Sequence, residues 1–154
     1  MMERKHIDVF VDGLKHYFDH LDITTTGSKR TLDISAPYLI SSQQKLGLDY
    51  TGMISVTGSR TGYIFFSAKS SLLRFILLSY GESDFSERFK SDLVGEVANT
   101  LAGNARKYLG SDFHISTPTI LANGIDASNY KLSKRCFVLP FRWRSNKAEL
   151  IVSI

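Results

Sequence analysis

The sequence lacks the features of several protein classes. It has a single cysteine, Cys136, so no disulfide can form within one chain, and a reducing compartment fits this composition. No stretch approaches the roughly 20 consecutive apolar residues that span a bilayer, and the charged N-terminus is not typical of a secretory signal. We therefore expect a cytoplasmic protein that does not insert into membranes.

Motifs for metals, nucleotides and nucleophiles are scarce as well. The histidines His6, His16, His20 and His114 form no ligand cluster with cysteine, and no third ligand accompanies His16 and His20 in the H-E-x-x-H manner. There is no P-loop, dinucleotide fingerprint or G-x-S-x-G motif. No histidine is near Cys136 in sequence, which favours a buried small hydrophobe over a nucleophile. We expect no metal site in this chain.

The excess of positive charge is small, since 19 basic and 15 acidic residues give a formal net charge of +4. Basic residues are densest near the C-terminus, on strands expected to alternate between two faces: Lys131, Lys134, Arg135, Arg142 and Arg144. No nucleic-acid motif accompanies them, so a solvated face is favoured and we expect no nucleic-acid partner. A nucleic-acid binder that uses these strands is the weaker alternative.

Hydrophobic spacing and turn residues predict one domain, residues 1–154, that mixes helices with strands. Asp84 is a possible cap of the longest helix, and Gly110 is its expected stop. The expected elements, in chain order, are a helix over about 4–21, a strand over 32–40 broken by Pro37, a hairpin of 46–57 with 63–68, a helix over 71–79, the long helix to about 108, an extended segment over 114–121, and a hairpin of 135–143 with 148–154.

Two segments resemble each other, Ile34-Ser-Ala-Pro-Tyr-Leu-Ile40 and Ile115-Ser-Thr-Pro-Thr-Ile-Leu121. Each follows a helix and precedes a hairpin, which indicates internal duplication with repeats at about 4–68 and 84–154 and a linker helix at about 70–80. A chance match of a short segment is the alternative. Two repeats that pool their strands predict an α+β fold with pseudo-two-fold symmetry, a largely antiparallel sheet, and helices packed on one face.

The long helix contains an unusual polar pattern in Asp92-Leu-Val-Gly-Glu-Val-Ala-Asn-Thr-Leu-Ala-Gly103. At about 100° per residue, Asp92, Asn99 and Gly103 fall within about 60° of the direction of Glu96. The apolar residues spread over an arc on the opposite side: Leu93, Val94, Val97, Leu101, Ala105 and Tyr108. The spacing therefore predicts an exposed polar ridge on a helix whose other face is anchored to the sheet.

Small residues, Gly95, Ala102 and Gly103, lie beside this ridge. A glycine inside a helix costs about 1 kcal/mol relative to alanine, so these positions suggest room for a close approach by a partner. The alternative is that another helix of the same protein packs there. An ordinary solvated helix surface is also consistent with the spacing alone.

The pattern D-x-x-x-E-x-x-N within G-E-V-A-N-T-L-A-G resembles the signature of the CheC/CheX/FliY family of chemotaxis phosphatases, which act on the phosphorylated response regulator CheY. The repeated order of elements resembles that family too, so the resemblance covers most of the chain. It implies a phosphatase that hydrolyses the phospho-aspartate of a CheY-type receiver domain. The alternative is a non-catalytic module that binds a receiver domain or a flagellar-switch component.

The resemblance also implies roles for single residues. Asn99 would enter the partner's active site and orient the attacking water, and Glu96 would pair with the partner's active-site lysine. The Mg²⁺ that the reaction needs would be held by the response regulator, so we expect no cofactor in this chain. The remaining positions would help the partner to dock without taking a chemical step: Asp92, Gly95, Ala102 and Gly103.

The N-terminal helix offers the same spacing with altered residues, in Asp8-Val-Phe-Val-Asp12-Gly-Leu-Lys15. Here the glutamate is shortened to Asp12 and the asparagine is replaced by Lys15, so we assign no site to this helix. A single intact motif is similar to CheX rather than to the two-site CheC type. The resemblance to CheX implies a homodimer in which the sheets of two copies join.

Overall fold

The computed structural model describes residues 4–26, 32–40, 46–122, 124–125, 130 and 136–154. In this part of the chain the helices are α1 (Arg4–Thr26), α2 (Ser70–Ser79) and α3 (Glu87–Leu109). The strands are β1 (Leu32–Ile34), β2 (Tyr38–Leu39), β3 (Tyr50–Gly58), β4 (Gly62–Ala68), β5 (Phe113–Ile115), β6 (Thr119–Leu121), β7 (Phe137–Trp143) and β8 (Asn146–Ser153).

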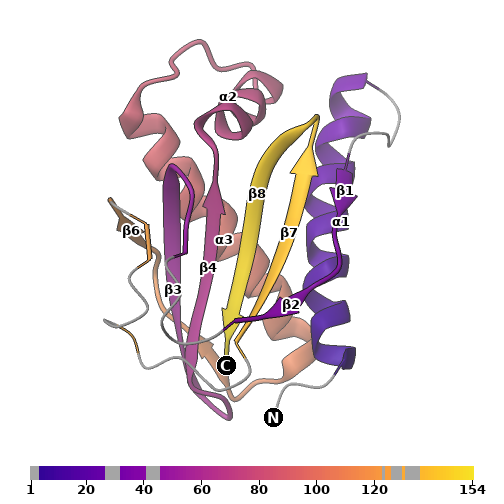
Figure 1. Cartoon of the computed structure of the whole chain (residues 1–154), viewed down its shortest axis with the longest axis vertical. Helices are drawn as coiled ribbons and strands as arrows, with labels where there is room; N and C mark the ends of the chain where they lie inside the picture. Colours follow the sequence, from indigo (N-terminus) through magenta and orange to yellow (C-terminus); the bar gives the residue numbers. More distant parts are fainter. Residues whose placement is uncertain (1–3, 27–31, 41–45, 123, 126–129, 131–135) are drawn as a thin grey trace.

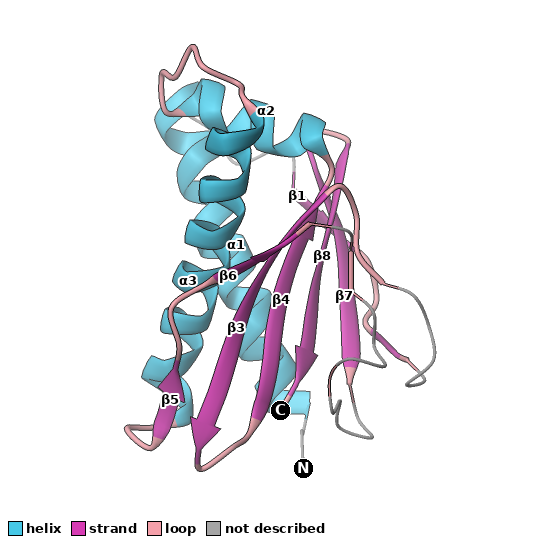
Figure 2. Cartoon of the chain, turned by 90° about the vertical axis from the view of Figure 1, so that its left-hand side faces the viewer, coloured by secondary structure: helices cyan, strands magenta, loops and turns pink. Residues whose placement is uncertain are grey.

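The strands form one 8-stranded sheet, and helices cover a single face of it (Figures 1 and 2). The helices α1 and α3 lie along that face, and α2 lies at one end of the molecule. The larger hydrophobic core fills the space between helices and sheet and includes Phe18, Phe66 and Trp143. A smaller cluster lies on the other face: Ile40, Leu46, Phe65, Ile125, Cys136, Val138 and Ile151. The predicted α+β class is confirmed.

The sheet order places the strands of the two halves of the chain against each other. The order is β1-β7-β8-β4-β3-β5, with β2 also paired to β7 and β6 also paired to β3. Every pairing is antiparallel, and the two hairpins meet at the centre, where Phe66 of β4 faces Leu150 of β8. The proline-broken strand of the first half, β1 and β2, pairs with β7, and that of the second half, β5 and β6, pairs with β3. The bounds of the repeats, about 4–68 and 84–154, stay a prediction.

Several element boundaries differ from the expected ones. The hairpin strand expected from residue 46 begins at Tyr50, and Leu46 makes only an isolated bridge to Ile125. The last strand begins at Asn146, because Arg144 and Ser145 adopt positive φ angles of 50° and 65° and close a two-residue turn. The start of the last hairpin was expected at residue 135, which lies outside the described residues.

The cap of the long helix was also expected at the wrong residue. The cap of α3 is Ser86, whose side chain accepts a hydrogen bond from the backbone N–H of Phe89. Asp84 instead accepts a hydrogen bond from the backbone N–H of Ser86, at 2.9 Å, and so orders the turn before the helix. The expected stop is confirmed, because Gly110 is the C-cap with a φ of 107°.

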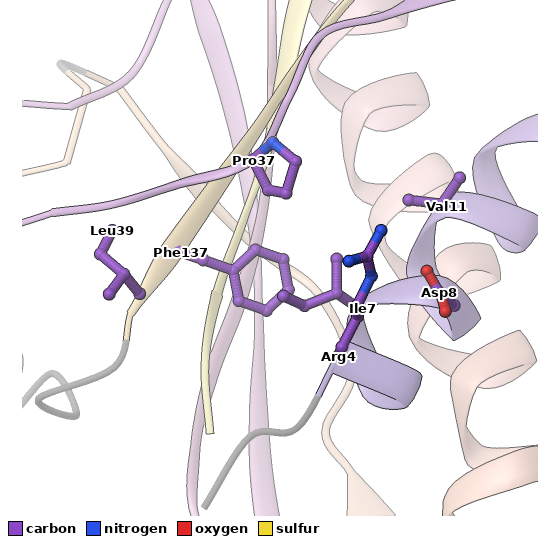
Figure 3. A pocket seen from close by; sticks show the side chains of 7 residues that line it. All are labelled: Arg4, Ile7, Asp8, Val11, Pro37, Leu39 and Phe137. Carbon is purple, nitrogen blue, oxygen red and sulfur yellow. The ribbon is translucent and has the colours of Figure 1, made fainter.

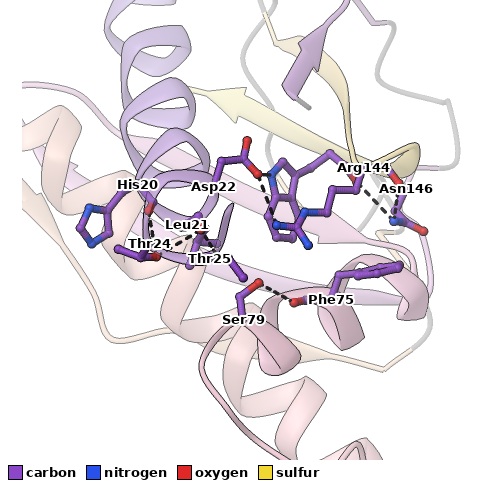
Figure 4. Close-up of polar contacts among 10 residues, drawn as sticks. His20, Leu21, Asp22, Thr24, Thr25, Phe75, Ser79, Arg144 and Asn146 are labelled. Carbon is purple, nitrogen blue, oxygen red and sulfur yellow. Dashed lines mark hydrogen bonds and ion pairs between the residues drawn. The ribbon is translucent and has the colours of Figure 1, made fainter. Parts of the chain in front are cut away.

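The C-terminal part of α1 is anchored to the β7–β8 turn by a buried polar contact (Figure 4). Asp22 is only 1% exposed, and its Oδ1 atom accepts a hydrogen bond of 3.1 Å from the indole Nε1–H of Trp143. The same oxygen lies 3.6 Å from the guanidinium of Arg144, which stacks 4.6 Å above the Trp143 ring. A buried carboxylate needs such partners, so this contact fixes where α1 lies on the sheet.

The backbone of α3 lies directly on strand β3. A Cβ atom at Gly52 would lie 2.7 Å from the carbonyl oxygen of Val94 and 3.1 Å from the Cα of Gly95. Only a residue without a side chain permits this approach. The side of α3 that faces the core is fully apolar or small: Leu93, Val94, Gly95, Val97, Ala98, Leu101, Ala102 and Ala105. This contact fixes both the height and the rotation of α3.

The contact at Gly52 predicts opposite effects for two glycine substitutions. Gly52→Ala pushes a methyl group into the backbone of α3, and we expect it to lower the free energy of unfolding by about 1–3 kcal/mol. Gly103→Ala is the matched control, since nothing lies within 4 Å of a Cβ at that position. It should raise the free energy of unfolding by up to about 1 kcal/mol. Urea denaturation measures both, and equal effects of the two substitutions would contradict the packing of α3 on β3.

Candidate active site

The polar ridge of α3 faces solvent. Asp92, Glu96 and Asn99 are exposed, and Gly103 is partly exposed at the end of the same row. Glu96 and Asn99 lie three positions apart, so their side chains are neighbours on the helix surface. The hydroxyl of the neighbouring Thr100 donates a hydrogen bond of 2.9 Å to the carbonyl oxygen of Glu96, so the Thr100 side chain is bonded within its own helix. The helical spacing predicted the outward direction of the carboxylates and the carboxamide.

Two of the expected partner-binding residues lie inside the molecule instead. Gly95 is buried, and a Cβ there would lie 2.9 Å from Cδ1 of Ile120 and 3.3 Å from Cβ of Pro118. Ala102 is fully buried in the main core. Their small size therefore serves packing within this chain, and we correct the expectation that they meet a partner. The spacing misled because both positions flank the ridge on its inner side.

One further residue departs from the expected pattern of α3. Tyr108 was expected on the apolar side of the helix, but it is 68% exposed. Leu109 of the same turn packs against the main core, and Tyr108 beside it points to solvent. Arg106 and Lys107 in the same turn are exposed as well, and positive charge there suits the C-terminal end of the helix dipole.

A cavity of about 250 Å³ opens beside the ridge, between the end of α2 and the first half of α3. Asp92 and Glu96 contribute to its wall, so the ridge borders a concave surface rather than a flat one. The other lining residues are apolar, aromatic or acidic: Leu77, Tyr80, Glu82, Phe89 and Leu93. Sequence spacing did not identify the residues of α2 and of the α2–α3 connection, because nothing local links them to α3.

Two tyrosines meet next to this cavity. The hydroxyl of Tyr17, on α1, lies 2.9 Å from the hydroxyl of Tyr80, and either can donate. Burial raises the pKa of Tyr17, and the hydrogen bond with Tyr80 and the negative charge of Glu96 raise it further. Tyr17 therefore keeps its proton at any physiological pH. Since the two residues are 63 positions apart, no local signal in the sequence predicts this contact.

A family model described as chemotaxis phosphatase CheX matches residues 50–142, which is more than half of the chain. The chain belongs to the CheX family of chemotaxis phosphatases. The matched region includes all of α3, and so contains Asp92, Glu96, Asn99 and Gly103. The family resemblance seen in the sequence is thereby confirmed, while the roles of the single residues stay predictions.

Solved structures show the same fold. A CheC-like superfamily protein from Shewanella sp. PV-4 is 24% identical, with a TM-score of 0.74 and 97% of each chain covered. CheX from Vibrio vulnificus is 21% identical, with a TM-score of 0.72, covering 97% of this chain and 98% of that one. The CheX–CheY–BeF3–Mg²⁺ complex from Borrelia burgdorferi contains a chain 18% identical, with a TM-score of 0.68 and 96% of each chain covered. Among curated proteins, no significant match was found.

Within this CheX-family chain, α1 differs from α3 where the two helices would be equivalent. Asp8, Asp12 and Lys15 are exposed, so the altered motif also faces outward. In this alignment Val11 of α1 is equivalent to Gly95 of α3. Gly95 lies close to Ile120 and Pro118, whereas Val11 lines an apolar cavity of about 500 Å³. Figure 3 shows the side chains of α1 facing those of the β1–β2 segment across Phe137. The lining residues are Arg4, Ile7, Asp8, Val11, Pro37, Leu39 and Phe137.

Other chemistry finds little support in the described part of the CheX-family chain. No group of three or more histidine, cysteine, aspartate and glutamate side chains among the described residues could hold a metal ion. Within the same residues, no helix is long and apolar enough to cross a membrane. Of the predicted basic group, Arg142 is exposed, Arg144 packs on Trp143 and Asp22, and Lys131, Lys134 and Arg135 lie outside the described residues.

The single cysteine is buried in the smaller core cluster. Burial raises the pKa of the Cys136 thiol to about 11, although a hydrogen bond with Ser153 opposes this shift. The thiolate is the reactive form of cysteine, so a raised pKa makes this side chain a poor nucleophile. The expectation of a buried small hydrophobe is confirmed by its position.

The raised pKa of Cys136 predicts slow thiol chemistry. At pH 8 the folded chain should react with an aromatic disulfide reagent at least about 100-fold more slowly than the urea-unfolded chain, because burial and the shifted pKa both suppress the accessible thiolate. The rate for the folded chain should rise as the pH approaches about 11, as long as the fold persists. Equal rates for folded and unfolded chain at pH 8 would contradict the burial of this thiol.

Proposed function

We propose that this chain is a phosphatase that hydrolyses the phospho-aspartate of a CheY-type receiver domain by inserting Glu96 and Asn99 into the receiver's active site. The observation that carries this proposal is the exposed carboxylate–carboxamide pair on a helix whose opposite face is clamped to the sheet, in a chain of the CheX family. The similarity of its fold to a chain in a CheX–CheY–BeF3–Mg²⁺ complex supports the same partner class.

This chain has to supply only a correctly placed water, because an aspartyl phosphate is an acyl phosphate and is already activated for hydrolysis. Asn99 holds a water in line with the phosphorus through its side-chain amide, which accepts and donates hydrogen bonds while it stays neutral. The water oxygen bonds to phosphorus as the bond to the aspartate oxygen breaks, and inorganic phosphate and the free carboxylate are released. The proton of the water leaves with the phosphate. A neutral amide does not repel the phosphoryl group, as a carboxylate would.

The other residues of the ridge place the amide. Glu96 forms a charge-assisted hydrogen bond with the active-site lysine of the receiver and so fixes the docked helix. Asp92 and Gly103 meet the rim of the receiver, and Gly103 lets that rim come close because nothing lies within 4 Å of its missing side chain. Catalysis is then a matter of positioning rather than of covalent intermediates on this chain. The Mg²⁺ of the reaction is held by the receiver.

We further propose that the chain acts in the cytoplasm as a homodimer whose sheets join. Among the described strands, the sheet order ends at β1 on one side and at β5 on the other, so each of these short strands has one unpaired edge. Sheet edges readily pair with another strand, which gives a second copy a place to add. Light scattering of the purified chain reports the oligomeric state directly.

The alternative function is a binding module that docks on a receiver domain or a flagellar-switch component without hydrolysis. The same exposed ridge would serve it. The two functions differ in one observable, which is the lifetime of the phosphorylated receiver when the chain is bound. A binding module leaves that lifetime unchanged, while a phosphatase shortens it.

Two substitutions separate the roles of the ridge residues. Asn99→Ala should lower kcat by about 100-fold or more, since it removes the group that orients the water, while receiver binding changes little. Glu96→Ala should mainly weaken binding, because it removes the ion pair with the receiver. The measurement is the decay of phosphorylated receivers from the same genome, with and without each variant.

Arg142→Ala is the control for both variants, since Arg142 is exposed on β7 and lies between two residues of the main core, so its side chain points to the face of the sheet that α3 does not cover. It should behave as the parent does. Decay that is as fast with Asn99→Ala as with the parent would refute the site assignment. Binding by the parent without any change in phosphate lifetime would favour the binding module.

A further inference from the structure

We propose that Tyr80, held in place by Tyr17, is a docking residue for the receiver and determines how tightly the receiver binds beside Glu96. The inference rests on the proposed function and extends it to residues outside the ridge. The receiver contacts the exposed side chain of Tyr80 at the end of α2 when Glu96 and Asn99 enter the receiver's active site.

The backbone of Tyr80 is fixed by the end of α2. Tyr80 is the C-cap of that helix, and its N–H donates to the carbonyl oxygens of Ile76 and Leu77 at 3.1 Å each. The following Gly81 turns the chain with a φ of 78°, and the N–H of Glu82 returns to the carbonyl oxygen of Leu77 at 3.0 Å. Glycine suits this turn because other residues rarely adopt that angle.

The other end of the side chain is fixed by α1. The hydroxyl of Tyr80 bonds to the hydroxyl of Tyr17, whose ring packs edge-on against Phe18 with centroids 5.0 Å apart. Between these two anchors, Tyr80 is still 54% exposed. An exposed aromatic ring that is already held in one orientation loses little conformational entropy when a partner covers it.

Tyr80 also lies in the right place for this role. It lines the same cavity as Asp92 and Glu96, so a receiver that engages Glu96 comes within reach of its ring. Burial raises the pKa of the Tyr17 hydroxyl, and the hydrogen bond with Tyr80 and the negative charge of Glu96 raise it further. The hydrogen bond between the two tyrosines therefore persists at physiological pH. Tyrosine is enriched among the residues that dominate binding energy at protein interfaces.

The test measures KM and kcat for the phosphorylated receiver, together with Kd for the same receiver activated with beryllofluoride and Mg²⁺. Tyr80→Ala should raise KM and Kd about 10-fold or more while kcat stays within about twofold of the parent. Tyr17→Phe and Tyr80→Phe remove only the bond between the hydroxyls, so each should raise KM by the same smaller factor. The double variant should be no worse than either single variant, because both changes remove one shared interaction.

Tyr108→Ala is the matched control. It removes another exposed tyrosine, 12 positions after Glu96 and therefore about 18 Å farther along α3, and should leave KM and Kd at the parent values. Parent-like KM and Kd for Tyr80→Ala would overturn the proposal, as would a fall in kcat at unchanged KM. Additive effects of the two Tyr→Phe changes would overturn the shared anchor.

The outcome can be separated from that of the proposed function. A parent that binds the activated receiver without hydrolysing its phosphate contradicts the phosphatase, and the Kd values of the variants then still decide the role of Tyr80. A parent that neither binds nor hydrolyses contradicts both. Should Tyr80→Ala fail to fold by circular dichroism, Tyr80→Phe and Tyr17→Phe decide the question, because they keep the rings and the packing.

Discussion

The backbone of α3 lies directly against Gly52 of β3, and this contact sets the height and the rotation of the helix that holds the polar ridge. A helix that lies this close to a strand cannot rotate about its axis without driving side chains into the sheet. The rotation that results buries Leu93, Val94 and Val97 and leaves Glu96 and Asn99 exposed. A rigid helix with a fixed outward row is what a mechanism based on positioning needs, because an error of about 1 Å at the reacting centre is costly.

The remaining helices complete the surface around this row. The buried contact of Asp22 with Trp143 and Arg144 holds α1 on the sheet, and the Tyr17–Tyr80 bond then connects α1 to the end of α2. The cavity next to Glu96 is lined by the end of α2, the α2–α3 connection and α3, and α1 bonds to its wall through Tyr17 and Tyr80. The half of the molecule that contains α1 has the same order of elements but a different helix surface. There Lys15 stands at the position of Asn99, and Val11 borders an apolar cavity.

Much of the fold and of the ridge could be predicted from the sequence, because both depend on local periodicity. Alternating strands, helical spacing and the repeated proline-broken segment were enough for the α+β class and for the outward direction of Asp92, Glu96 and Asn99. The burial of Gly95 and Ala102 could not be predicted, since it depends on Ile120 and the core meeting α3 from elsewhere in the chain. The Tyr17–Tyr80 contact was missed for the same reason, and the cap of α3 was misplaced because Asp84 and Ser86 are both good caps.

The most direct test of this account is a crystal structure of the chain in complex with a receiver domain activated by beryllofluoride and Mg²⁺. In that complex the carboxamide of Asn99 should lie about 3 Å from a water that is in line with the beryllium, with Glu96 paired to a lysine of the receiver. A complex in which the receiver binds another surface and the outward face of α3 stays in solvent would contradict it.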